Sequence, residues 1–200
     1  MSILRFFPLL LLFVVFSGSS VTTALAPATK KCGTERWAVK TLSDSGGKKV
    51  NLKPEYWSIG DLVRLKNPIR KGGRPPDTRL SPMEYRTFLV QGYVIGYKLE
   101  SDGDFHVIIA DKTDRTQTMI VEVPDPQCDG ASSSGLADKY QSARGQLIRL
   151  VGSPRMGLAR PNWDVLVNVI GVGFFDTLKG QAGAAPNGFE LHPVISLDVP

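Results

Sequence analysis

The feature that most constrains the fold is a succession of β-rich runs in the second half of the chain. The first run, residues 87–99, contains Gly92 and Gly96, and glycines inside a strand usually mark a bend or a bulge. Residues 100–104 supply a hairpin turn around an Asp-Gly dipeptide, and residues 105–110 form the returning strand. The sequence therefore predicts an antiparallel hairpin whose first strand is strongly bent.

A third strand and the only convincing helix follow the hairpin. Residues 119–123 alternate as in a strand until two prolines end it. Behind a serine-rich cap region at 132–134, four residues recur at helical spacing: Leu136, Tyr140, Ala143 and Leu147. A β-branched strand at 164–175 and a last strand at 189–199 complete the series.

The order of these elements predicts the fold. Three strands, one helix and two more strands, with a bent first strand, describe the OB-fold, a five-stranded Greek-key barrel. We therefore expect a mainly β domain at 87–200, an OB-like barrel with one helix between strands 3 and 4. A β-sandwich is the alternative, and it is less favoured because the helix falls where the OB plan has one.

The start of the chain has the three parts of a secretory signal peptide. Arg5 precedes an apolar run at 6–16, and small residues follow it. The apolar run is shorter than the roughly 20 residues that span a bilayer as a helix. We expect cleavage after Ala28, which makes 1–28 the signal and the protein secreted or periplasmic, with no membrane span after cleavage. An uncleaved anchor is the alternative.

Two cysteines, Cys32 and Cys128, follow the predicted signal. Two thiols in an oxidising compartment most simply pair with each other, and this bridge would be worth ~4–5 kcal/mol in the chain-entropy model. Residues 29–86 are irregular, with short strands expected at 37–42 and 61–65. We interpret them as an N-terminal arm that lies on the barrel and is tethered through the disulfide.

Charge divides the chain into two parts. Residues 30–86 hold 14 basic and 6 acidic residues, whereas residues 87–200 hold 9 basic and 13 acidic ones. A basic segment beside an acidic body can bind anionic polymers, or the two parts can neutralise each other. Both interpretations stay open.

The expected fold suggests a binding surface. OB barrels often bind oligonucleotides or oligosaccharides with aromatic and basic side chains. The candidate binding residues from the arm and from the loop before the last strand are Arg36, Trp37, Lys40, Gln181 and Asn187. The alternative for the two amides is structural, since side chains in long loops often satisfy backbone groups.

Several motifs of this chain resemble those of a family of uncharacterised secreted bacterial proteins. They lie at residues 35–41, 102–106, 119–128, 173–176 and 180–193. The resemblance implies a bacterial, exported, OB-like domain, and it implies no activity. Lys179 stands where the family pattern has a histidine, which puts in doubt any chemistry that needs a third histidine there.

The two histidines of the chain each have a carboxylate two residues away. Asp104 and His106 share a face of one strand, and Glu190 and His192 share a face of the last strand. If these faces converge, the four side chains could hold a divalent metal that activates water. The alternative is structural, with the histidines satisfied by hydrogen bonds on half-exposed strands.

Other chemistries have less support. No serine lies in a Gly-x-Ser-x-Gly motif, and no glycine-rich phosphate loop precedes a helix. We expect no cofactor, and an exported binding or accessory module for an anionic envelope polymer or an oligosaccharide. The alternative function is a metal-assisted hydrolase or nuclease, which requires the two imidazoles to lie close together.

Overall fold

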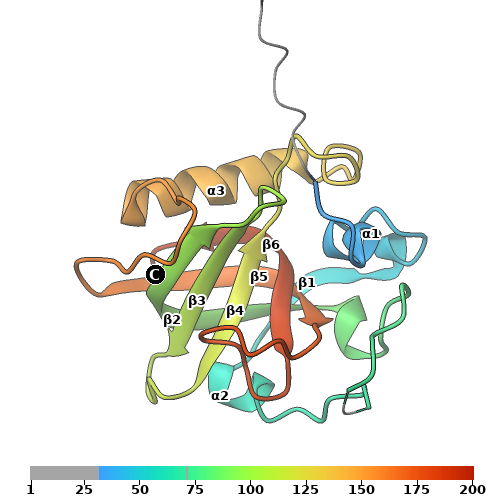
Figure 1. Cartoon of the computed structure of the whole chain (residues 1–200), viewed down its shortest axis with the longest axis horizontal. Coiled ribbons are helices and arrows are strands. Elements are labelled where there is room, and N and C mark those ends of the chain that lie inside the picture. The colour runs from blue at the N-terminus through green and yellow to red at the C-terminus, as the bar shows by residue number, and fades with distance from the viewer. Residues whose placement is uncertain (1–31, 71) are drawn as a thin grey trace, which may run out of the picture.

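The computed structural model describes residues 32–70 and 72–200, and its main element is a closed β-barrel (Figure 1). One sheet has the strand order β1-β2-β3-β4-β6-β5, and a further pairing of β2 with β5 closes every strand except β1 into the barrel. The strands are β1 (Asn51–Tyr56), β2 (Arg86–Leu99), β3 (Phe105–Asp111), β4 (Thr118–Val123), β5 (Val165–Phe175) and β6 (Phe189–Asp198). The predicted mainly β, five-stranded OB-like barrel is confirmed.

Helices make up little of the described chain. They are α1 (Trp37–Lys40), α2 (Ile59–Leu62) and α3 (Ala137–Val151), together with single 3₁₀ turns at Gly47–Lys49 and Met83–Tyr85. Within residues 32–70 and 72–200, no helix is both long enough and apolar enough to cross a bilayer. The predicted signal peptide at 1–28 lies outside the described residues.

The long strand β2 belongs to both sides of the barrel. Its first part pairs with β5, from Thr87 to Val94, and its second part pairs with β3, with a register shift between Val94 and Gly96. A Cβ on Gly92 would lie 2.7 Å from the side chain of Ile59 and 2.8 Å from a β3 carbonyl oxygen. The predicted bulge is thus present, and Gly92 allows β3 and α2 to approach the bent strand closely.

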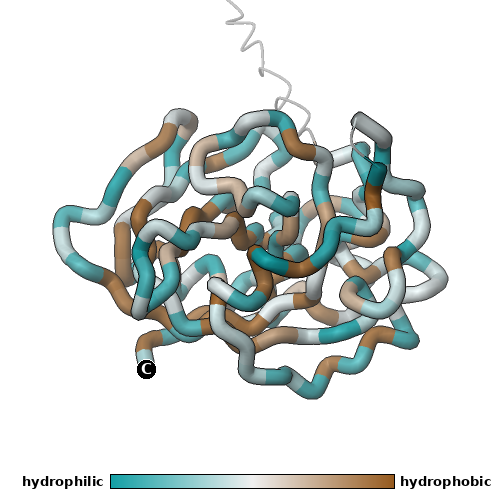
Figure 2. The backbone as a smooth tube through the Cα atoms, turned by 90° about the horizontal axis from the view of Figure 1, so that it is seen from below, coloured by the Kyte–Doolittle hydropathy of each residue, from teal (hydrophilic) through white to brown (hydrophobic). Residues whose placement is uncertain are grey.

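Alternation along the strands fills the barrel with apolar side chains. The inner residues include Phe88, Val107, Val121, Val167 and Leu191, all of which are fully buried. Figure 2 shows hydrophobic stretches gathered in the middle of the molecule, with mostly hydrophilic loops around them. Because successive strand residues point to opposite faces, the residues between these apolar positions lie on the outside of the barrel.

The predicted helix is confirmed as α3, which packs on β6 and lies between β4 and β5 in the chain. Its buried residues include Tyr140, Ala143 and Leu147, as the spacing predicts. The serine-rich segment does not provide a side-chain N-cap, because Leu136 occupies that position. Ser134 Oγ instead accepts a hydrogen bond from the Leu136 amide at 3.1 Å, one residue before the helix.

The strands expected in the arm are wrong. Residues 37–42 form α1 and its C-terminal turn, where the Thr41 hydroxyl donates to the Trp37 carbonyl at 2.8 Å. Residues 61–65 lie in and after α2, whose N-cap Ser58 accepts a hydrogen bond from the Asp61 amide at 3.0 Å. Both segments have strand-like composition, but local side-chain caps and tertiary contacts fix them as single helical turns.

The strand that the arm does contain is β1, which pairs in parallel with the start of β2. It contains Lys53, Pro54 and Glu55, and its residues are mostly exposed. Such an edge strand shows little hydrophobic alternation, so the sequence gives little signal for it.

A buried ion pair within the arm attaches it to the barrel, because both partners also bond to the backbone of β5. The two guanidinium Nη atoms of Arg36 donate to the two carboxylate oxygens of Glu84 at 2.9 and 2.6 Å. Arg36 also donates to the Phe175 carbonyl at 3.0 Å, and Glu84 accepts from the Phe175 amide at 2.9 Å. The pair therefore holds the arm against the end of β5.

A disulfide joins Cys32 to Cys128 and is the second attachment of the arm. The predicted pairing is confirmed. The bridge closes a separation of 96 residues, so it ties the start of the described chain to the segment between β4 and α3.

The Arg36–Glu84 pair gives a test of this attachment. We expect Glu84→Gln to lower the free energy of unfolding by about 3–5 kcal/mol, because it leaves a buried guanidinium without its charged partner. Urea denaturation of both proteins measures the difference. The control is Glu55→Gln, whose partner Arg86 is partly exposed and already screened by water, so its unfolding curve should stay close to that of the parent protein. Equal losses in the two variants would contradict the role given to the buried pair.

Candidate functional site

Four polar side chains gather on the outer face of the barrel, where β3, β4 and β6 run side by side. His106 pairs directly with Glu122 across the β3–β4 register. In β6, Leu191 points inward beside Val121, so Glu190 and His192 point outward beside Glu122. The two histidine-bearing strands are thus joined through β4, and the predicted convergence of their faces occurs.

The arm covers this face. The Arg36 guanidinium lies 4.5 Å and the Lys40 ammonium 5.4 Å from the centre of the Phe174 ring, which also points outward from β5. His106 and His192 are 1 % and 0 % exposed. The outer face is therefore a buried polar layer between the barrel and the arm.

Glu122 is the centre of this layer. Its Oε1 lies 2.8 Å from His106 Nδ1, and its Oε2 lies 3.0 Å from His192 Nδ1. Glu100 Oε1 approaches the same His106 nitrogen at 3.3 Å and lies 2.8 Å from Lys98 Nζ. One carboxylate therefore links both imidazoles, and a second carboxylate reaches the first imidazole from the hairpin turn.

His192 lies between two carboxylates. Its Nε2 is 3.3 Å from Asp104 Oδ2, while Asp104 Oδ1 accepts from the Asp125 amide at 3.0 Å. Neither ring nitrogen of His192 nor Asp104 Oδ2 makes a hydrogen bond of regular geometry. Burial alone would lower the pKa of His192, but the charges of Asp104 and Glu122 outweigh it and raise this pKa. Burial also raises the pKa of Asp104, and His192 opposes that shift.

The two buried glutamates of this layer have opposite pKa shifts. Burial alone would raise the pKa of Glu122, but the imidazoles of His106 and His192 outweigh it and hold this pKa well below its usual range. Burial, together with the charges of Glu122 and Asp176, raises the pKa of Glu190 well above its usual range. Glu122 is therefore a carboxylate at neutral pH, whereas Glu190 keeps its proton to a higher pH than an exposed glutamate does.

Lys40 brings a positive charge from the arm to this layer. Burial alone would lower the pKa of its ammonium, but the carboxylates of Glu122 and Asp176 outweigh it and raise this pKa. Lys40 is therefore charged at neutral pH, and it faces the carboxylates from the side opposite to the barrel.

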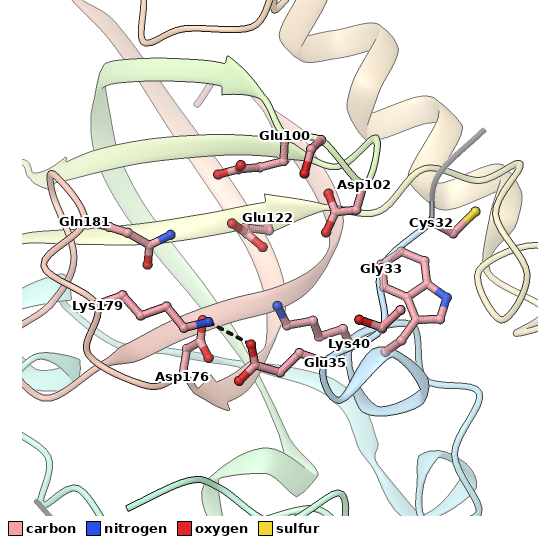
Figure 3. Close-up of a pocket in the computed structure, with 13 residues that line it drawn as sticks. Cys32, Gly33, Glu35, Lys40, Glu100, Asp102, Glu122, Asp176, Lys179 and Gln181 are labelled. Carbon is pink, nitrogen blue, oxygen red and sulfur yellow. Dashed lines mark hydrogen bonds and ion pairs between the residues drawn. The ribbon is translucent and has the colours of Figure 1, made fainter. Parts of the chain in front are cut away.

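A cavity of about 250 Å³ opens beside Glu122 (Figure 3). Figure 3 shows Glu122, Lys40 and Gln181 projecting into the same space from β4, the arm and the loop before β6. Of the charged residues that line it, five are acids and two are bases: Glu35, Glu100, Asp102, Glu122, Asp176, Lys40 and Lys179. Lys179 pairs with Glu35 at 2.7 Å, which leaves Lys40 as the one base of this lining beside four further acids. The cavity therefore has an excess of negative charge.

The structure separates the five candidate binding residues into two groups. Trp37, Lys40 and Gln181 line the cavity. Arg36 is instead buried in its pair with Glu84. Asn187 donates to the carbonyls of Leu62 and Leu65 at 2.9 and 3.0 Å and accepts from the Phe189 amide, which is the structural alternative considered for this loop.

Among residues 32–70 and 72–200, two groups of side chains have the geometry to hold a metal ion. They are Glu100, His106 and Glu122, and Asp104, Glu122 and His192, and within each group the ligand atoms lie within 4.8 Å of one another. Three of the four predicted metal residues belong to these groups, and Glu190 belongs to neither. Lys179, which stands where the resemblance led us to expect a histidine, pairs with Glu35 and belongs to neither group.

Sequence reasoning missed Glu122 and Glu100. A signal for Glu122 was present, because a charged residue between Val121 and Val123 in an otherwise apolar strand is unusual. Its partner depends on the β3–β4 register, which the intervening turn sets. Glu100 lies in the hairpin turn, where an acidic residue normally faces solvent and gives no signal.

No family model, no curated protein and no solved structure matches this chain. The resemblance to the family of secreted bacterial proteins therefore stays a prediction. The case for a function depends on the geometry of the polar layer and of the cavity beside it.

The opposite pKa shifts of Glu122 and Glu190 can be tested with a matched pair of variants. We expect Glu122→Gln to lower the free energy of unfolding by about 3–5 kcal/mol at pH 7, because two imidazoles lose their buried carboxylate. We expect Glu190→Gln to be as stable as the parent protein or more stable at pH 8, because the amide removes the penalty that the raised pKa of this buried acid places on folding.

The sign of the pH dependence follows from the two pKa shifts. The contribution of Glu122 is present above its unfolded pKa and is lost as the pH falls through its lower folded pKa. The raised pKa of Glu190 penalises folding increasingly as the pH rises above its unfolded pKa. Urea denaturation at pH 4 and pH 8 checks the sign of both effects. A Glu190→Gln variant that is less stable than the parent protein at pH 8 would contradict the raised pKa of Glu190.

Proposed function

We propose that this protein is an exported hydrolase that uses a divalent cation held by Glu100, His106 and Glu122. The observation that carries the proposal is the convergence of these three side chains, two of which, Glu100 and Glu122, line an acidic cavity. Imidazole nitrogen together with carboxylate oxygen is a donor set that suits Zn²⁺ and Mn²⁺.

The spacing of the ligand atoms supports a cation at this place. His106 Nδ1 lies 3.3 Å from Glu100 Oε1 and 2.8 Å from Glu122 Oε1. Ligands bound about 2.0–2.2 Å from one metal ion are about 3.0–3.5 Å apart, so small side-chain shifts would suffice. Glu100 Oε1 also pairs with the Lys98 ammonium at 2.8 Å, so a cation bound here would displace that ammonium from this oxygen.

Access favours this group of ligands over the second one. Glu100 and Glu122 line this cavity, and His106, itself only 1 % exposed, lines an adjoining one, whereas Asp104 and His192 line neither cavity. A catalytic metal ion keeps one position open for water or substrate. The buried pair instead fixes the orientation of Glu122 through His192, as residues behind a metal ligand commonly do.

The remaining charged groups of the cavity suit a hydrolytic reaction. A divalent cation at this site would lower the pKa of a bound water and polarise a substrate oxygen. Lys40, charged and facing Glu122, would stabilise negative charge that develops on the substrate in the transition state.

Metal titration of the purified protein, freed of metal with chelator and followed by calorimetry, tests the proposal. We expect one Mn²⁺ or Zn²⁺ per chain, and metal-dependent hydrolysis of an activated ester such as p-nitrophenyl acetate. His106→Ala should abolish metal binding and lower kcat/KM. The loss should exceed the roughly 10–100-fold that follows from removing a residue that only hydrogen-bonds to a metal ligand.

Asp104→Asn is the matched control, because it alters the buried group and leaves Glu100, His106 and Glu122 in place. We expect it to bind metal, with a loss of affinity within that 10–100-fold range. Loss of binding in Asp104→Asn, with binding kept in His106→Ala, would place the cation in the buried group and overturn the proposal.

The binding-module hypothesis has one observation in its favour, namely that Trp37, Lys40 and Gln181 line the same cavity. An aromatic ring, an ammonium and an amide suit a neutral oligosaccharide. The acidic excess of the cavity does not favour an anionic polymer. Saccharide binding by a protein that takes up no divalent cation would favour this function over the hydrolase.

A further inference from the structure

A second cavity, of about 310 Å³, adjoins the first one. Both cavities include Glu100 and Gln181 in their walls, and the second also includes His106. The ligands proposed for the cation therefore lie at the boundary between the two cavities.

The second cavity differs from the first in its chemistry. Its apolar wall residues are Leu99, Ile108, Met156, Leu158 and Ala182. Met156 and Leu158 are 67 % and 47 % exposed, which leaves two large apolar side chains in contact with water. They lie in the loop between α3 and β5.

This exposed loop is held in place by backbone hydrogen bonds. Ala159 and Tyr97 form an antiparallel bridge with two bonds of 2.9 Å, and the Leu99 amide donates to the Arg155 carbonyl at 2.9 Å. On the other side, a Cβ on Gly183 would lie 2.1 Å from Ile108 Cγ2, so the loop before β6 packs directly on that residue. The cavity thus has two fixed walls.

We propose that this cavity binds an apolar acyl chain, so that the substrate is a carboxylic ester or amide of such an acid. The inference rests on the proposed hydrolase function. An acyl chain in the second cavity places its carbonyl group at the boundary, next to Glu100 and His106. The polar alcohol or amine part then lies in the acidic cavity.

Charge favours a carboxylic ester or amide over a phosphodiester. The acidic cavity is lined by five carboxylic acids and two lysines, and one of these lysines is paired with Glu35. An anionic phosphodiester would be repelled by this excess, whereas an ester or an amide is neutral. A cationic or hydroxylated leaving group suits the acidic cavity best.

The reaction is a simple hydrolysis. The oxygen of water adds to the carbonyl carbon, and the bond to the leaving oxygen or nitrogen breaks with its electron pair. The leaving group takes up a proton from the water, so the products are a carboxylic acid and an alcohol or an amine.

Chain length gives the first test, with p-nitrophenyl acetate, butyrate, hexanoate and octanoate as substrates of the Mn²⁺-loaded protein. Each buried methylene should raise kcat/KM by about fourfold until the cavity is full. Leu158→Trp, which fills the cavity from an exposed position, should remove this gain, so that octanoate is hydrolysed no faster than acetate. Leu52→Trp, an exposed leucine of β1, is the matched control and should keep the gain.

Alkylammonium ions give a second test that needs neither metal nor hydrolysis. Calorimetry of the metal-free protein should show that octylammonium binds more tightly than propylammonium, with an affinity gain of about fourfold per methylene. Leu158→Trp should abolish this difference in affinity. Hydrolysis without any chain-length preference would overturn this inference and leave the proposed function standing. Chain-dependent binding without hydrolysis of any ester would overturn the proposed function and keep the apolar site. The absence of both effects would overturn both.

Discussion

The site depends on the buried ion pair between Arg36 and Glu84. Both partners also bond to the backbone of Phe175, so the pair fixes the arm to the end of β5. From there α1 crosses the outer face of the barrel and brings Lys40 opposite Glu122. Without this attachment the face would be an ordinary hydrated surface, and the shifted pKa values, which arise largely from burial, would be lost.

The covered face is polar where stability alone would favour apolar residues. Replacing buried charged groups by well-packed hydrophobic residues is often neutral or stabilising, so a buried ionic layer is weak evidence for a stabilising role. Here the pKa of Glu122 is lowered and that of Glu190 is raised, although both lie on the same face. Carboxyl groups whose pKa values are driven apart at a cavity are typical of catalytic sites.

The barrel was predictable because its strands and its helix have regular sequence periodicity. The arm and the pairing of the site residues were not, because they depend on contacts between residues far apart in the chain. Alternation and helical spacing indicated the barrel strands and α3, and the parity of His106 and His192 within their strands indicated that each shares a face with a carboxylate. The single turns α1 and α2 could not be predicted, because their conformation depends on long-range partners such as Glu84. The pairing of His106 with Glu122 follows from a strand register that residue types alone do not fix.

The charge of a segment is a poor guide to the charge of a site. The arm is basic in sequence, which suggested a surface for anionic polymers, yet its arginines mostly pair within or close to the arm. These ion pairs are Arg36–Glu84, Arg64–Asp61, Arg79–Asp44 and Arg86–Glu55. The cavity is lined by five acids and two lysines, Lys179 is already paired with Glu35, and Lys98 pairs with Glu100 from outside this lining. The cavity is therefore acidic in a protein of net positive charge. Because the potential at a site is dominated by its nearest charges, this cavity favours cations and neutral molecules over the polyanions that the sequence suggested.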